Sequence, residues 1–529
     1  MQWGAQIMRR DVEALSCGVF DLAVVGGGIY GVCVARDAAL RGLSVALVER
    51  GDFGAATSFN SLKIIHGGFR YLQSADLPRL RESVRERRYW LWAAPHLVRP
   101  LQFVIPLGSG LARSGAAFRA ALMTYQLLAI DGNRGLRGDR SLPAGRLIGR
   151  EACREQVPGL SGPPPRGGVT WFDAQVVNTE RLLLECLQQA SEAGAVVCNH
   201  VTARQLIEQG GRVHGVACED AVTGRSLEVC ARVTVDATGP YRLNAGHREG
   251  KRGLVKSMNL VIAGSKAAHA FGAEIPGTGR MVFVTPWRGC SIVGTSHVGY
   301  SGDPDRCQYS TDDAAALIDE LDAALPGLDV AADRILWRQG GLLPAAAAAH
   351  DGSAVPASRG ELIDHARGDG RDGLVSVLGE KYTTARALAE RVVDLCLRKL
   401  RRRPRPCEAL HTPLPGAAGC VAGCDAEQSG FGLPARDRWR VAVREEMAVT
   451  LEDLVFRRCD RAVRGRMAAE ELEAAADVMA EELRWSPQRR LDEVASARRF
   501  AAGHGGTWAS ASWPESTPAS TRVDIRRAV

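Results

Sequence analysis

Residues 20–31 read FDLAVVGGGIYG, an apolar run that passes directly into glycines. The run 20–25 has the apolar, β-branched character of a buried parallel strand. Gly26, Gly28 and Gly31 then give the spacing G-x-G-x-x-G. The first glycine permits a tight turn, the second admits a pyrophosphate, and the third lets a helix pack close to the strand. The pattern predicts a strand, a turn and a helix that together bind a dinucleotide.

The next residues complete this unit. We expect the helix over 32–41, with Gly42 as its stop, and a second strand over 44–48 that ends at Glu49. A carboxylate about 20 residues beyond the glycines binds the ribose of a dinucleotide. A second match to the glycine spacing, 368–373, follows a polar stretch and precedes a strand-like run, so we interpret it as a loop. The spacing predicts one bound dinucleotide and leaves NAD and FAD both open.

Composition narrows the class of protein. The 529 residues are 46% hydrophobic and 24% charged, which indicates a globular chain of about three domains. The net charge is +7, and the one dense basic run, 398–403, favours a solvated helix end or linker over a nucleic-acid site. The 14 cysteines are spread singly, as in a reduced cytoplasmic protein, and we find no metal pattern. The longest apolar stretch, 116–130, is interrupted by polar residues and predicts a core or interfacial helix, not a membrane span.

Further motifs follow in order along the chain. They are GDF 51–53, TS 57–58, SLKIIHGGFRYL 61–72, RER 85–87, APHLVRP 94–100, DAQ 173–175, NTERL 178–182, DATGP 236–240, PW 286–287, GT 294–295, SR 358–359, GEKYTTAR 379–386, HTPLPG 411–416 and LED 451–453. Together they resemble the FAD-dependent glycerol-3-phosphate dehydrogenase family over residues from about 20 to 500. Members pass electrons from glycerol 3-phosphate to quinone or another acceptor. The resemblance identifies the cofactor as FAD.

The resemblance implies an α/β fold of the D-amino-acid-oxidase type. It has a Rossmann-type FAD-binding domain built from discontinuous segments, an α+β substrate cap with an antiparallel sheet, and a C-terminal helical domain. We expect the FAD domain from 18–75, 150–250 and 355–395, the cap from 76–149 and 251–354, a linker over 396–432, helices over 433–503 and a disordered tail over 504–529. Ser486 should cap a helix that begins at Pro487.

The cofactor residues follow from the same motifs. By resemblance they are Gly26, Gly28, Ile29, Gly31, Glu49, Arg50, Thr57, Ser58, Ser61, Lys63, His66, Gly67, Gly68, Thr238, Gly239, Gly379, Lys381 and Thr383. The run 233–239 is a strand that ends in a turn of small residues, which suits close approach to a cofactor. Residues 379–384 should start a helix whose N-terminus stabilises negative charge on reduced flavin. Thr383 and Thr384 are equally well explained as helix caps.

The substrate residues include several departures from the family. The resemblance places Arg70, Tyr71, Arg359 and Lys381 around the substrate, since planar donors bind anions well. At four other positions this chain differs: Asn259 stands where the family has His, His297 where it has Asp, Leu343 where it has a phosphate-binding Arg, and Glu380 where it has Gly. Losing an Arg–phosphate pair costs about 1.5–3 kcal/mol. The pocket is therefore expected to suit a less anionic or differently shaped alcohol.

The mechanism implied is hydride transfer from a small alcohol to flavin N5. His66, Lys381 and His297 are candidate bases, and Arg359 and Lys381 would steady the carbonyl oxygen that develops. We expect a cytoplasmic enzyme of glycerol metabolism and electron transfer, with quinone or another acceptor. Peripheral contact with the inner face of a membrane and a homodimer both stay open. The alternatives are an FAD enzyme for another alcohol or an amine, with oxygen as acceptor, and a non-catalytic flavin-binding relative.

Overall fold

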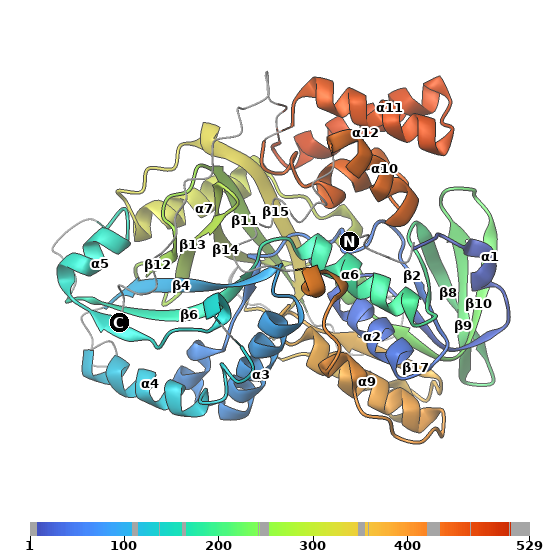
Figure 1. Ribbon diagram of the computed structural model, residues 1–529, viewed down its shortest axis with the longest axis horizontal. Helices are drawn as coiled ribbons and strands as arrows, with labels where there is room; N and C mark the ends of the chain where they lie inside the picture. The colour runs from blue at the N-terminus through green and yellow to red at the C-terminus, as the bar shows by residue number, and fades with distance from the viewer. Residues whose placement is uncertain are drawn as a thin grey trace.

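The computed structural model describes residues 8–107, 115–136, 138–160, 166–241, 243, 253–346, 355–357, 359–419, 434–465, 467–506 and 508. Across these residues, the strands form an eight-stranded and a nine-stranded sheet, and helices from the C-terminal part of the chain pack beside them (Figure 1). The predicted α/β class, with a Rossmann-type unit, an antiparallel cap sheet and C-terminal helices, is confirmed.

The eight-stranded sheet carries the glycine turn. In spatial order its strands are β16 (Glu361–Asp364), β17 (Leu374–Leu378), β10 (Ser226–Asp236), β1 (Val19–Val25), β2 (Val45–Val48) and β7 (Val196–Cys198), with β9 (Arg212–Asp220) and β8 (Val201–Gln209) off this path. From β17 to β7 the strands are parallel, whereas β16, β9 and β8 pair antiparallel. The parallel centre is what consecutive strand–helix–strand units produce.

Both faces of this sheet are buried, because alternate side chains of a strand point to opposite sides. Leu22 and Val24 lie in the core formed with three helices, whereas Ala23 and Val25 pack with the β8–β9 meander. The helices are α2 (Ile29–Leu40), α6 (Thr179–Glu192) and α9 (Ala385–Lys399). Burial on both faces explains why 20–25 is almost continuously apolar, and the strand predicted there is confirmed.

The first helix after the glycines begins earlier than predicted. α2 starts at Ile29, three residues before the expected position, and Gly28 occupies its N-cap. Gly42 has φ +78°, a left-handed conformation that glycine adopts at little cost, so its role as the helix stop is confirmed. The second glycine match, 368–373, begins at the last residue of α8 (His365–Gly368) and otherwise forms the loop before β17, in agreement with the loop interpretation.

The nine-stranded sheet forms the substrate cap. In spatial order its strands are β15 (Ile335–Pro344), β11 (Leu254–Ala263), β14 (Cys290–Tyr300), β13 (Met281–Trp287), β12 (Ala270–Glu274), β4 (Val98–Pro106), β6 (Gly168–Val176) and β3 (Ile64–Ile65), with β5 (Arg146–Ile148) beside β6. All recorded pairs are antiparallel except β12 with β4. The helices of this region are α3 (Leu77–Ala93), α4 (Gly115–Leu128), α5 (Arg150–Gln156) and α7 (Thr311–Ala324). Figure 1 shows α7 on one side of the sheet and α3 and α4 on the other.

Two strands lie outside the segments predicted for the cap. β3 falls within 18–75 and β6 within 150–250, yet both pair in the nine-stranded sheet. The strand alternation of 168–176 fits either sheet, and its partner β4 lies more than 60 residues earlier, beyond the reach of local pattern rules. The two pairings correct the assignment of these strands, and the domain boundaries themselves stay a prediction.

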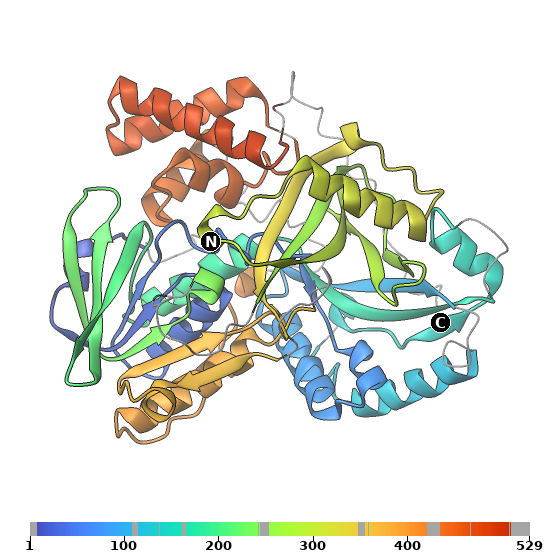
Figure 2. The same cartoon turned by 180° about the vertical axis from the view of Figure 1, so that it is seen from behind.

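The C-terminal helices form a separate layer (Figure 2). They are α10 (Ala435–Glu445), the short π-helical segment η9 (Asp453–Arg458), α11 (Ala469–Leu483) and α12 (Pro487–Gly503). Ser486 accepts a hydrogen bond from the amide of Arg489, so the predicted cap and the start at Pro487 are confirmed. Of the predicted linker, 420–432 lies outside the described residues, as does the predicted tail apart from 504–506 and 508.

Candidate cofactor and substrate site

A cavity of about 530 Å³ lies where the two sheets meet. Its walls come from the carboxyl ends of β1, β2 and β10, the loop after β17, and the cap strands β11, β14 and β15. The carboxyl edge of a parallel sheet is where such folds bind ligands, because helix N-termini and strand-end loops converge there.

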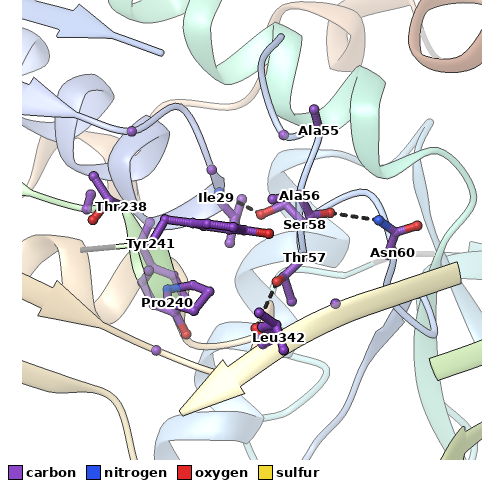
Figure 3. Close-up of a pocket in the computed structure, with 18 of the residues that line it drawn as sticks. Ile29, Ala55, Ala56, Thr57, Ser58, Asn60, Thr238, Pro240, Tyr241 and Leu342 are labelled. Carbon is purple, nitrogen blue, oxygen red and sulfur yellow. Dashed lines mark hydrogen bonds between the residues drawn. The ribbon is translucent and has the colours of Figure 1, made fainter. Parts of the chain in front are cut away.

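The glycine turn lines one end of this cavity with Gly26, Gly28 and Ile29, and we call this the narrow end. Gly26 has φ +106°, and a Cβ on it would lie 2.6 Å from the carbonyl oxygen of Ala237. A Cβ on Gly31 would lie 1.9 Å from the Gly26 oxygen. Gly31 therefore does not line the cavity but lets α2 pack onto the turn, as the spacing predicts. At the first turn of α2, the amide of Ile29 donates to Ser58 Oγ at 3.0 Å (Figure 3).

Glu49 holds the turn from the end of β2. Its carboxylate accepts hydrogen bonds from the amides of Gly27 at 2.6 Å and Gly51 at 2.9 Å. Burial raises the pKa of Glu49, and the two amides act against this rise. Each carboxylate oxygen can accept more than one hydrogen bond, so Glu49, which lines the cavity, retains capacity for a ribose hydroxyl.

These features fit FAD. The turn at Gly26 has no room for a side chain, so it can cradle a pyrophosphate. The N-terminus of α2 faces this turn, and the Glu49 carboxylate lies beside it. The small-residue turn after β10 brings Thr238 and Gly239 to the same wall. In Figure 3 the side chain of Tyr241, which follows this turn, points toward Ile29 and Ser58.

The part of the cavity lined by residues 379–382 and 341–343, which we call the wide end, is assembled from distant segments. Thr57 Oγ1 donates to the carbonyl of Leu342 at 2.9 Å, which ties the cofactor loop to β15 (Figure 3). The Tyr30 hydroxyl donates to the carbonyl of Lys381 at 2.7 Å and accepts from its amide at 3.0 Å. A Cβ on Gly379 would lie 1.9 Å from the Tyr30 ring, so only glycine fits there. Sequence reasoning missed Tyr30, because it occupies an unspecified position of the glycine motif.

The loop before α9 differs from its prediction. α9 begins at Ala385, so 379–384 is a loop and not the first turn of a helix. Thr384 occupies the N-cap position but makes no side-chain capping bond. Thr383 is buried, and its hydroxyl accepts from the amide of His66 at 3.1 Å, which joins two motifs instead of capping a helix. A tertiary contact explains the difference, because the Thr383 hydroxyl is hydrogen-bonded to His66, more than 300 residues away in the sequence.

A cluster of charged side chains stands at this wide end. Lys381 Nζ lies 2.9 Å from Glu380 Oε1 and donates to the hydroxyl of Tyr71. Arg79 lies 3.2 Å from the same Glu380 oxygen, and its guanidinium carbon is 4.2 Å from the centre of the Tyr71 ring. Burial lowers the pKa of Lys381 and raises that of Tyr71 to about 12. Tyr71 thus keeps its proton near neutral pH.

Two histidines near the cavity are neutral at pH 7. Burial, with the charges of Arg280 and Arg70, lowers the pKa of His297 to about 4. His297 lines the cavity, and its Nδ1 lies 2.9 Å from Ser257 Oγ. Burial and the charge of Lys381 lower the pKa of His66 to about 3. An uncharged imidazole has a lone pair for a proton, which a base requires.

The polar wall beside His297 comes from neighbouring strands. Asn259 on β11 is buried, and its Oδ1 accepts from the Thr295 hydroxyl at 2.7 Å. Leu343 on β15 lines the cavity where the resemblance places a phosphate-binding arginine, and it offers no donor. The departures read from the sequence therefore face the cavity.

The structure brings most of the predicted residues to the cavity wall. Those lining it are Gly26, Gly28, Ile29, Glu49, Arg50, Thr57, Ser58, Ser61, Thr238, Gly239, Asn259, His297, Leu343, Gly379 and Lys381. Those that do not are Gly31, Lys63, His66, Gly67, Gly68, Arg70, Tyr71, Arg359 and Thr383. The functional roles of all these residues stay predictions.

Some residues off the wall have other partners. Lys63 is buried and donates to Thr179 at 2.7 Å, so its contacts brace the protein interior. The amide of Gly67 donates to Asp173 at 2.5 Å. Arg359 is 71% exposed, pairs with Asp76 at 2.6 Å and does not line the cavity.

Comparisons with known proteins agree with this architecture. A family model described as FAD dependent oxidoreductase matches residues 21–395, and one described as the C-terminal domain of alpha-glycerophosphate oxidase matches residues 438–490. Glycerol-3-phosphate dehydrogenase of Synechocystis is 32% identical over 441 residues, which are 80% of this chain and 78% of the relative. The mitochondrial glycerol-3-phosphate dehydrogenase of Macaca fascicularis is 27% identical, over 91% of this chain and 73% of the relative.

A solved structure has a similar fold. Glycerol-3-phosphate dehydrogenase from Bacillus halodurans, crystallised with FAD, superposes with a TM-score of 0.72 at 22% identity, and the match covers 93% of this chain and 96% of that one. At this identity the likeness concerns the fold.

Proposed function

The chain belongs to the FAD-dependent oxidoreductase family, among the glycerol-3-phosphate dehydrogenases, and from that premise we propose that it oxidises glycerol 3-phosphate or a closely related small polar alcohol to the ketone. The observation that carries this proposal is Lys381, which lines the same cavity as the dinucleotide cradle and donates to Tyr71, against which Arg79 stacks. Cationic and phenolic donors there suit a hydroxylated substrate with an anionic group.

The residues of the wide end would divide the work of the reaction. Bound FAD supplies a hydride acceptor at N5. Lys381 would orient the substrate oxygens and stabilise negative charge on the oxygen that becomes the carbonyl, and Tyr71 would position its ammonium group. We assign the proton acceptor to His297 ahead of His66, because His297 lines the cavity. In the tautomer whose Nδ1–H donates to Ser257, Nε2 of His297 carries the lone pair that takes the hydroxyl proton.

The electron acceptor is proposed to be quinone or another carrier reached at a membrane surface. No helix among the described residues is long and apolar enough to cross a bilayer. α4 and the turn after it, however, expose Met123, Leu127 and Ile130, at 65%, 70% and 81%. We propose that this apolar stripe makes peripheral contact with the inner face of the membrane. Vesicle sedimentation of wild type and a variant with all three changed to Ser tests the contact.

A second candidate function has support of its own. Leu343 places no donor on the cap side of the cavity, and Glu380 lies between the two cations. Both features favour a less anionic alcohol, oxidised by the same hydride transfer.

Anaerobic bleaching of the flavin band near about 450 nm tests the proposal. Glycerol 3-phosphate, glycerate and glycerol are each added to the purified yellow protein, and the rate of bleaching is recorded. We expect at least one of them to reduce the flavin within seconds to minutes. Protein that retains FAD but is not reduced by any small alcohol would point to a non-catalytic flavin binder.

A further inference from the structure

Glu380 has a different environment from the other acidic side chains of the cavity wall. Among the described residues lining the cavity, the carboxylates are Glu49, Asp305 and Glu380. Glu49 is held by two backbone amides, and Asp305 pairs with Arg50 in a largely exposed ion pair of 2.6 Å. Glu380 is only 9% exposed and contacts Lys381 and Arg79 at the wide end. A buried carboxylate in that position competes directly with an anionic substrate.

We propose that Glu380 determines the charge preference of this site, so that it favours an alcohol with at most one negative charge over a dianion. The inference rests on the proposed function, because it concerns the substrate of the same site. Glu380 holds Lys381 at 2.9 Å and Arg79 at 3.2 Å through a single oxygen. The two cations and one carboxylate carry one net positive charge. A monoanion balances that charge, whereas a dianion leaves a negative charge in a poorly solvated place.

Tyr71 keeps the cations close to Glu380. The Arg79 guanidinium stacks 4.2 Å from the ring centre, and Lys381 Nζ lies 4.7 Å from it and donates to the hydroxyl. Arg79 is 13% and Lys381 21% exposed, so water and salt screen the cluster weakly. An incoming anion therefore meets cations that are already fixed and partly neutralised.

The other side chains considered at this site add little positive charge to offset the negative charge of Glu380. Leu343 contributes only hydrocarbon to the wall, and His297 and His66 are neutral. The charge of Arg70 acts on Lys381 and His297, but Arg70 is exposed, so solvent screens part of its contribution. The substrate class that fits is a neutral polyol or a hydroxy acid with one carboxylate.

The test uses anion binding to the holoenzyme, which does not require turnover. Sulfate and acetate are titrated at constant ionic strength, and the flavin absorption change gives each dissociation constant. In Glu380→Gln we expect sulfate to bind about tenfold more tightly, the effect of freeing one charge-assisted contact. Acetate should gain about threefold or less, because a monoanion responds to half the charge. Equal gains for both anions, or no gain for sulfate, would overturn the proposal.

Two further variants make the result decisive. Glu482→Gln is the matched control, because Glu482 is 10% exposed and paired with Arg444 at 2.6 Å in the C-terminal helices. Its anion affinities should equal those of wild type. If Glu380→Gln does not retain flavin, Glu380→Gly, which removes the whole side chain, is measured in its place with the same expectation.

Substrate kinetics separate this inference from the proposed function. The ratio of KM for glycerol 3-phosphate to KM for glycerol should fall about tenfold in Glu380→Gln, in step with sulfate affinity. If sulfate affinity rises but no alcohol reduces the flavin in either protein, the proposed function fails and the charge role of Glu380 stands. If glycerol 3-phosphate is oxidised and sulfate affinity does not change, the inference about Glu380 fails alone.

Discussion

The two ends of the cavity are built by different rules. At the narrow end, Gly26, Gly31 and Glu49 lie within 24 positions of one another and act through backbone geometry. At the wide end, Glu380 meets Arg79 across 301 positions, and Lys381 meets Tyr71 across 310. Backbone geometry tolerates almost no substitution, whereas a cluster of side chains can be retuned one member at a time. The narrow end therefore keeps the cofactor common to the family, and the wide end can change the substrate.

The largest effect should follow from Gly31→Ala at the narrow end. The new Cβ would lie 1.9 Å from the Gly26 oxygen, so α2 must move off the turn that binds the pyrophosphate. We expect protein that purifies without flavin and is destabilised by about 1–3 kcal/mol, as in other overpacked sites. The ratio of flavin to protein absorbance and a urea titration measure this. Gly149→Ala is the control, since nothing lies within 4 Å of its Cβ, and flavin loss there would remove the steric explanation.

Glu49→Gln should have the next largest effect. An amide cannot accept at both positions now bonded to Gly27 and Gly51, and it is a weaker partner for a ribose hydroxyl. FAD affinity should fall about tenfold to hundredfold. Equilibrium titration of apoprotein with FAD, followed by flavin fluorescence, gives the value. Glu208→Gln, on the exposed face of β8, should bind FAD as wild type does; equal losses in both variants would argue against a specific role for Glu49.

The same contrast explains what the sequence could predict. The strand, turn, helix and carboxylate of residues 20–49 follow local rules of propensity and spacing, and the structure differs only by moving the helix start to Ile29. Motifs predicted site roles for Arg359 and Thr383. In the structure Arg359 pairs with Asp76, and the Thr383 hydroxyl accepts from the amide of His66. Their partners lie near the opposite end of the sequence, and a motif carries no information about such contacts. Tyr30 was missed because the glycine motif leaves its position unspecified and its partner is 351 positions away.

At the wide end, Lys381→Met should reduce catalysis without releasing the cofactor. Met preserves the bulk, and the backbone bonds of this position to Tyr30 remain. We expect kcat/KM for the reducing alcohol to fall about tenfold to hundredfold, as for loss of one charge-assisted contact in a transition state. Anaerobic flavin reduction at varied substrate concentration separates KM from kcat. Lys399→Met, where the ammonium pairs with Asp364 at the end of α9, should keep wild-type kinetics. Unchanged kinetics in Lys381→Met would remove this residue from the site.

Leu343→Arg should have a smaller effect, and this effect should be a gain in affinity for glycerol 3-phosphate. A guanidinium on β15 would add a cationic donor to the cap side of the cavity, at some cost in desolvation. The KM for glycerol 3-phosphate should fall roughly threefold to tenfold, and that for glycerol should not. Leu343→Met controls for the change of shape. An equal fall for both substrates would mean that the gain is not electrostatic.

The smallest expected effect is on thermal stability, through the ion pairs that join the narrow end to the C-terminal helices. Asp52 follows Glu49 closely, is buried, and accepts from Arg457 and Arg458 at 2.6 Å each. Arg457 also donates to Asp453, whose carboxylate lies 2.8 Å from His200 Nε2. Burial opposes the charged imidazole, but the hydrogen bond and charge of Asp453 prevail and raise the pKa of His200.

A raised pKa in the folded state makes this contact sensitive to pH. Its stabilising effect is complete below the unfolded pKa of about 6.5 and is lost as pH rises through the higher folded value. Wild-type Tm should therefore fall more between pH 6 and pH 8 than that of His200→Asn, by about 2 °C or less in a protein of this size. Asn suits the test because residue 200 has φ +52°, which Asn tolerates better than most side chains. Differential scanning fluorimetry of both holoenzymes gives the two slopes. Parallel slopes would show that the C-terminal helices brace the cofactor end without help from the charge on His200.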